Sequence, residues 1–303
     1  MFEALLESIV KTATPLLLAA MGEMFVEESG VINIGIEGVM LSAAFFAMAA
    51  AYFSASPLLG LLSGVGAALA ITAIFALLVI NLAVNQVVAG TAINLFAVGL
   101  TGVFYRRLFG ITGSAFTVKT FNSMALGPLT RIPIIGRALF DQDVIVYAAF
   151  GLVPLIAVIF RRTRFALRLR AAGERPAAAD ALGLNVYRLR WQALAASAVL
   201  TGISGAYLTL AYTNTFVEGI SAGRGFIALS IVVLGRWNAW GLAASSLLFG
   251  TAIAFQFGLQ AMGTTAPYQL FLALPYVLTL VVLATIGDSA RGPSALGEPY
   301  RRT

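Results

Sequence analysis

The ionisable side chains of this chain are few, and their types exclude most catalytic chemistry. The sequence holds 19 Lys and Arg and 13 Asp and Glu in 303 residues, with no His and no Cys. The usual zinc and haem ligands and the commonest general base are therefore missing. The acids crowd into a few places and do not pair across the hydrophobic segments. We therefore expect no enzyme active site, no metal and no cofactor.

Polar residues inside hydrophobic segments are better suited to bind a passing solute than to react with it. An amide both donates and accepts hydrogen bonds, so it suits a neutral polyhydroxyl or base-bearing solute. An acid at membrane depth is also a candidate for function. Interhelical hydrogen bonds explain the same amides without any transport role. The candidate path residues are Asn33, Glu37, Asn85, Gln86, Asn94 and Gln256.

Residues 161–190 form a cationic segment with the pattern of a docking element. Eight of the 19 Lys and Arg lie there against two acids, a net charge of 8 − 2 = +6. At its centre a Pro precedes a run of Ala and a Gly follows, which is typical of one short helix near 174–182. A short helix on a basic loop suggests a surface for a partner. The candidate docking residues are Gly173, Glu174, Arg175, Pro176, Ala178, Asp180, Leu182 and Gly183.

The elements that must position these residues are membrane-spanning helices. The chain is 60% hydrophobic and 11% charged, with a mean hydropathy of +0.92, far more apolar than a soluble protein. A helix needs about twenty apolar residues to cross a bilayer. The sequence thus predicts an all-α polytopic bundle of about 8–10 spans, one transmembrane domain over 1–303. The predicted spans are 4–22, 37–54, 58–80, 86–105, 144–160, 191–212, 225–236, 240–260 and 268–286.

The two largest polar interruptions, 106–143 and 161–190, flank the single span 144–160 and must face opposite sides. Residues 161–190 carry eight cations and residues 106–143 carry five. Because cytoplasmic loops are enriched in Lys and Arg, this difference predicts that 161–190 is cytoplasmic and 106–143 extracytoplasmic. The C-terminal tail then lies in the cytoplasm. The positive charge is explained by this topology, so we expect no nucleic-acid partner.

Two Gly-rich stretches interrupt the hydrophobic pattern at similar places in the two halves of the chain. Residues 29–38 read SGVINIGIEG, and residues 218–226 read EGISAGRGF. Paired Gly-broken hydrophobic segments indicate broken helices and a transporter site built from two related halves. Ordinary turns between spans would explain the same composition, and both interpretations stay open.

Three stretches together resemble one family of membrane proteins. Residues 30–40 (GVINIGIEGVM), 172–185 (AGERPAAADALGLN) and 225–229 (GFIAL), the last followed by LGRW at 234–237, occur in the family's order. They are similar to the inner-membrane permeases of bacterial ABC importers for nucleosides. That group also includes the ribose-type and branched-chain amino-acid permeases. The stretch 236–240, RWNAW, lacks a Pro often found before the corresponding Gly, which leaves the local backbone open.

The resemblance implies partners and a location. The chain would pair with a second homologous permease and with cytoplasmic ATPase subunits, and would receive solute from an extracytoplasmic solute-binding protein. It would be a multi-pass protein of the bacterial inner (plasma) membrane, without ATPase activity of its own. The helix near 174–182 would couple to the ATPase, while the surrounding Arg residues contact membrane lipid or acidic ATPase residues.

Two alternatives remain within transport. The same machinery could carry a simple sugar or another small solute. A secondary transporter would instead need a coupling acid deep in a span, and the acids near Glu27 and Glu37 are its only candidates.

Overall fold

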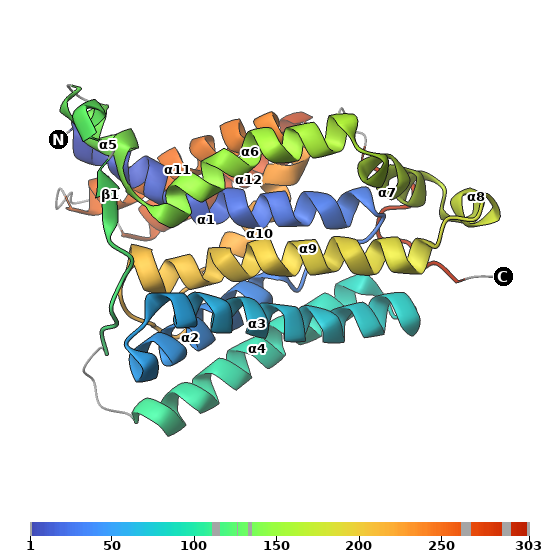
Figure 1. The fold of residues 1–303 in the computed structure, drawn as a ribbon, viewed down its shortest axis with the longest axis horizontal. Helices are drawn as coiled ribbons and strands as arrows, with labels where there is room; N and C mark the ends of the chain where they lie inside the picture. The colour runs from blue at the N-terminus through green and yellow to red at the C-terminus, as the bar shows by residue number, and fades with distance from the viewer. Residues whose placement is uncertain are drawn as a thin grey trace.

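Long helices make up most of the chain (Figure 1). The computed structural model describes residues 2–110, 116–125, 127–132, 135–261, 268–286 and 292–301. The long helices are α1 (Phe2–Glu28), α2 (Ile36–Ser54), α3 (Pro57–Ala76), α4 (Gln86–Phe109), α6 (Val144–Arg162), α9 (Val186–Tyr207), α11 (Ala239–Ala261) and α12 (Tyr268–Ile286). Helices α3 and α9 each continue into a π-helical turn, Leu77–Asn81 and Leu208–Tyr212.

Seven helices of the described residues are long and apolar enough to cross a membrane. Helix α10 (Arg224–Leu234) coincides with the predicted span 225–236, but with 11 residues it is too short to cross. Each of the nine predicted spans coincides with a helix, and the polytopic helical bundle is confirmed. That the bundle consists of two related halves stays a prediction.

Small residues allow the central helices to pack closely. A side chain at Gly64 of α3 would place its Cβ 2.8 Å from the carbonyl oxygen of Ala43 in α2. At Gly205 of α9 an added Cβ would collide with the carbonyl oxygen of Met40 in α2. Packing of this kind replaces the hydrophobic effect as the force between helices in lipid.

The two ends of the bundle carry different structures (Figure 1). One end holds the N-terminus, the 3₁₀-helix η2 (Gly127–Arg131), the short helix α5 (Gly136–Phe140) and a two-stranded antiparallel sheet of β1 (Ser123–Ala125) and β2 (Asp141–Asp143). The other end holds α7 (Arg164–Glu174), α8 (Pro176–Ala181) and the C-terminus. The described parts of 106–143 and the segment 161–190 thus lie at opposite ends.

The cationic segment 161–190 is more helical than the sequence suggested. Only Thr163 separates α6 from α7. Its hydroxyl accepts a hydrogen bond from the amide of Ala166 at 3.3 Å and so starts α7. Helix α9 begins at Val186, before the predicted start at 191, because the Asn185 side chain accepts from the amide of Arg188 at 2.9 Å. Hydrophobicity locates a span but not the polar turns that extend it.

Candidate functional site

The first Gly-rich stretch folds back into the bundle, and amides from α4 hold it there. The Gln86 side chain accepts a hydrogen bond from the amide of Ile32 at 2.7 Å. Further along α4, the Asn94 side chain accepts from the amide of Gly38 at 2.8 Å and donates to the carbonyl of Ile34 at 2.9 Å. Gln86 and Asn94 are eight residues apart, which corresponds to about 12 Å along α4. The chain therefore enters the bundle alongside α4 between residues 32 and 38.

A buried acid of α1 supports the same stretch. Glu23 is completely buried, and its carboxylate accepts a hydrogen bond from the amide of Asn33 at 2.8 Å. The side-chain oxygen of Asn33 is buried and has no partner among the described residues. Gly90 of α4 permits the close approach, because a Cβ there would lie 2.7 Å from the amide nitrogen of Gly35. Broken backbone at membrane depth requires such internal partners.

Glu37 joins the two Gly-rich stretches. One carboxylate oxygen accepts from the amide of Gly223 at 2.8 Å, and the other accepts from the amide of Gly225 at 2.7 Å. Gly223 has the left-handed φ of +78°, and a Cβ on Gly225 would lie 2.7 Å from the Glu37 backbone. The acid thereby caps the N-terminus of α10, where the helix dipole favours negative charge. We call residues 29–38 and 218–226 together the central junction.

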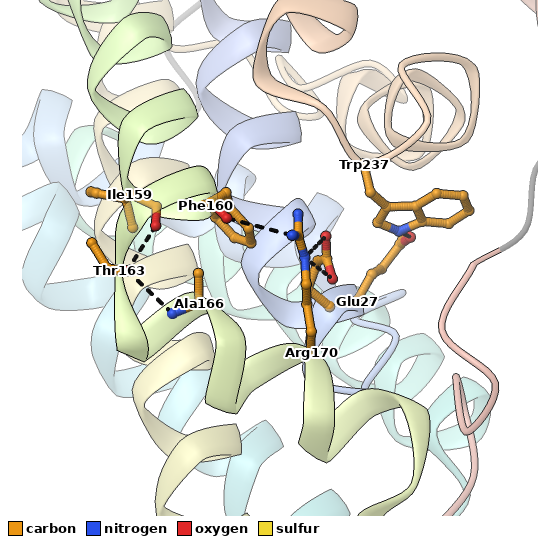
Figure 2. Close-up of polar contacts among 8 residues, drawn as sticks. Glu27, Ile159, Phe160, Thr163, Ala166, Arg170 and Trp237 are labelled. Carbon is orange, nitrogen blue, oxygen red and sulfur yellow. Dashed lines mark hydrogen bonds and ion pairs between the residues drawn. The ribbon is translucent and has the colours of Figure 1, made fainter.

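Helix α10 connects the central junction to the end of the bundle that carries α8. Arg236 and Trp237 follow it with left-handed φ values of 52° and 51°, in the stretch that lacks the expected Pro. This turn lets the Trp237 indole donate to the carboxylate of Glu27 in the last turn of α1 at 2.7 Å (Figure 2). Eleven helical residues span about 16 Å, roughly half the hydrocarbon core.

A cavity of about 180 Å³ lies beside the N-terminus of α10. Gln256 of α11 lines it, whereas the other predicted path residues do not. Sequence reasoning missed Arg224, whose signal was a cation inside a Gly-rich interruption of a hydrophobic pattern. The lining residues are Ala222, Arg224, Ile227, Ile253, Gln256, Phe257, Pro275 and Tyr276.

Asn85, another predicted path residue, lies outside the central junction. Its side chain accepts hydrogen bonds from the amides of Val87 at 2.9 Å and Val88 at 3.2 Å. It is exposed, and it caps the start of α4. The structure thus gives Asn85 a capping role, whereas Asn33, Glu37, Gln86 and Asn94 meet at the central junction.

The polar groups of the central junction are arranged for hydrogen bonding. In the described part of the chain, no three His, Cys, Asp or Glu side chains come close enough to hold a metal ion. The carboxylates of Glu23 and Glu37 are each bound to backbone amides. A solute beside the N-terminus of α10 would meet the Arg224 guanidinium and the Glu37 carboxylate, which already accepts from the amides of Gly223 and Gly225.

The predicted docking helix is α8, and it presents an uncovered surface. Pro176 is its first residue, and Gly183 follows it with a left-handed φ of +85°. Arg175 and Ala178 are exposed, and the Leu182 side chain is 85% exposed. An exposed leucine beside small residues is a candidate contact for a partner protein.

Helix α7, which leads into α8, packs against the end of α1. A Cβ on Gly173 would collide with the carbonyl oxygen of Glu28, so α7 can approach only because this position is Gly. Arg170 of α7 binds both carboxylate oxygens of Glu28 at 3.2 Å and stacks on the Phe160 ring at 5.4 Å (Figure 2). These contacts connect α8 to the helix that enters the central junction.

Residues 292–301, which we call the C-terminal segment, bind the same region through their backbone. The amide of Ala295 donates to the carbonyl of Gly173 at 3.0 Å. The amide of Gly297 donates to the carbonyl of Gly30, in the first Gly-rich stretch, at 3.2 Å. Sequence reasoning missed this role, because backbone hydrogen bonds over such separations leave no pattern in composition.

Side chains of the C-terminal segment also bind one residue just before α8 and one within it. The Ser294 hydroxyl donates to the Glu174 carboxylate at 2.6 Å. The Tyr300 hydroxyl donates to the Asp180 carboxylate at 3.0 Å. Among the docking residues, Glu174 and Asp180 are thus already bound within the chain, and the uncovered surface is the one that carries Leu182.

Comparison with known proteins gives a match over most of the chain. Residues 5–283 match the family model described as the permease component of the branched-chain amino acid transport system. A nucleoside ABC transporter permease of Lactococcus lactis is 36% identical over 95% of this chain and 93% of its own. A guanosine ABC transporter permease of Bacillus subtilis is 32% identical over 95% and 93%.

The name of a third relative gives a different substrate. A putative glucose ABC transporter permease of Haloferax volcanii is 32% identical over 98% of this chain and 97% of its own. No solved structure matches. The relatives are therefore alike in machinery and differ in the solute that their names give.

Proposed function

The chain belongs to the family of permease components of branched-chain amino acid transport systems, and from this we propose that it is the permease subunit of an ATP-binding cassette importer that moves nucleosides into the cell. The family match over residues 5–283 carries the proposal. As a permease component it forms the path and is not itself catalytic. Two relatives named for nucleosides or guanosine, at 36% and 32% identity, favour this substrate class.

The proposed energy source is a separate ATPase that binds α8. In support, α8 leaves Leu182 uncovered on a segment with a net charge of +6. The segment 161–190 and the C-terminus would lie in the cytoplasm, at the bacterial inner (plasma) membrane, because positive charge favours that side. A second homologous permease would complete the path, and a solute-binding protein would deliver solute at the end that carries α5 and β1.

The contacts around α8 suggest how ATPase movement would reach the path. A push on α8 would act on α7, and through the pair of Arg170 and Glu28 on α1. Glu27, the neighbour of Glu28, holds the far end of α10 through Trp237. The N-terminus of α10 is bound by Glu37 at the central junction. A rigid-body rocking of α1 and α10 would therefore open or close the bundle at the junction.

Reconstitution tests this proposal. The full complex in lipid nanodiscs should hydrolyse ATP faster when a nucleoside-loaded binding protein is added. Solute uptake driven by a proton or sodium gradient with the purified chain alone would contradict it and favour a secondary transporter. Stimulation by glucose but not by nucleosides would support the sugar alternative, which the Haloferax volcanii relative motivates.

A further inference from the structure

We infer that the cavity beside the N-terminus of α10 is a binding site for a neutral, ring-bearing solute that forms hydrogen bonds, such as a nucleoside. The inference rests on the proposed function and adds the residues that would hold the solute. Those residues are Arg224 on α10, Gln256 and Phe257 on α11, and Tyr276 on α12.

The position of the cavity suits a solute in transit. The C-terminal end of α10 lies beside Glu27, at the end of the α1 span, because Trp237 binds that acid. The N-terminal end lies about 16 Å away, roughly half the thickness of the hydrocarbon core. Along α4, Gln86 and Asn94 are separated by a similar distance of about 12 Å. Transporter sites near the membrane midplane are commonly built at such broken helices.

Polar atoms in the cavity retain hydrogen-bonding capacity. Gln256 is 7% exposed and lines the cavity. Arg224 is 8% exposed; it donates to the carbonyls of Ile220 at 2.9 Å and Ser221 at 3.3 Å, while its Nε has no partner in the described part of the chain. Buried polar groups normally have partners, and groups without one point to a ligand or water.

The charge balance favours a neutral solute. The N-terminus of α10 would attract an anion, but the carboxylate of Glu37 already occupies the amides of Gly223 and Gly225. The guanidinium of Arg224 and this carboxylate balance each other in formal charge. An added anion or cation would leave an uncompensated charge at membrane depth, which is costly.

The walls of the cavity fit a flat ring. The side chains of Phe257 and Tyr276 are partly exposed, and the Tyr276 hydroxyl donates to the carbonyl of Ala222 at 3.3 Å. Ile227 and Ile253 complete an apolar lining. Aromatic rings stack on planar heterocycles, while an amide and a guanidinium can bind the ring's polar edge. A nucleobase combines both features.

Cysteine labelling tests the inference, because the chain has no native Cys. We would label Phe257→Cys with N-ethylmaleimide in the nanodisc complex, with ATP and a binding protein loaded with adenosine, guanosine or uridine. The matched control is Phe255→Cys on the same helix. Phe257 lines the cavity and is 41% exposed, whereas Phe255 does not line it and is 51% exposed. Nucleosides should slow labelling at 257 several-fold and leave labelling at 255 unchanged.

Transport of the same nucleosides gives a second measurement. Gln256→Leu should slow uptake about tenfold, as expected when one hydrogen bond in a desolvated site is lost. Gln192→Leu on α9, where the glutamine is exposed and outside the cavity lining, should not change it. Melting temperatures of both variants would show whether each is folded.

The outcomes separate this inference from the proposed function. If nucleosides do not stimulate the wild-type ATPase, the proposed function fails. If they do stimulate it, but do not slow labelling at position 257 and Gln256→Leu transports normally, only the proposed binding site is overturned. Protection by ribose or glucose without protection by nucleosides would overturn the assigned ligand class.

Discussion

The central junction and α8 use polar and apolar groups in opposite ways. At the junction, buried and half-buried carboxylates and amides bind backbone groups, as the half-buried Glu37 does at the start of α10. At α8, in contrast, the apolar Leu182 is uncovered. A group with its partners inside the chain contributes to the stability of the chain, whereas an uncovered one contributes only when a partner binds. Substitutions in the two regions should therefore separate stability from coupling.

The largest loss of stability is expected for Gly225→Val. The new Cβ would lie 2.7 Å from backbone atoms of Glu37, and overpacking of this kind costs about 1–3 kcal/mol. We expect a lower melting temperature of the purified complex, measured by tryptophan fluorescence. The control is Gly151→Val in α6, where an added Cβ meets nothing within 4 Å. Equal melting of the two variants would contradict the close packing of the junction.

A smaller loss is expected for Glu37→Gln. The amide retains one acceptor oxygen, but its NH₂ group would face a backbone N–H of α10, which costs about 1 kcal/mol. Glu218→Gln is the control, because Glu218 is exposed and its contact with Arg106 at 3.9 Å is weak. The melting temperature should fall for Glu37→Gln alone. A similar fall in both would mean that the cap contributes little beyond surface charge.

These two predictions concern features that the sequence indicated only in part. The spans followed from hydrophobicity, since a helix across lipid needs a long apolar run. The two Gly-rich stretches were visible as interruptions, and α10 was visible as a half-length span. That Glu37 of one stretch binds the amides of the other depends on tertiary packing, which composition does not encode.

Other features of the candidate site could not be predicted for similar reasons. Asn85 looked like Gln86 in the sequence, yet it caps α4, because a residue just before a helix binds the first free amides. Arg224 was overlooked because its cavity forms only when α11 and α12 pack beside α10. The contact of Ala295 with Gly173 links residues far apart in the chain through backbone atoms.

Tyr300→Phe should sharpen the boundary between the two regions. It removes the hydrogen bond to Asp180, an expected loss of about 0.5–1 kcal/mol. Because this bond positions α8, the nucleoside-stimulated ATPase rate should fall relative to the basal rate. Tyr147→Phe is the control, since its hydroxyl donates to Met124 at 3.1 Å at the opposite end of the bundle. If both variants lower the rate ratio equally, the C-terminal segment has only a structural role.

The smallest effect on stability is expected for Leu182→Ala. The side chain is 85% exposed, so its removal deletes almost no packing within the chain and the melting temperature of the isolated permease should not change. If α8 is the ATPase contact, the leucine becomes buried on assembly, and its loss should weaken co-purification of the ATPase by about tenfold or more. Leu167→Ala on α7, where the leucine is 70% exposed, should do neither. A fall in melting temperature as large as that of Gly225→Val would show that Leu182 is packed within the chain. The distinction between the two regions would then fail, because both would stabilise the permease itself.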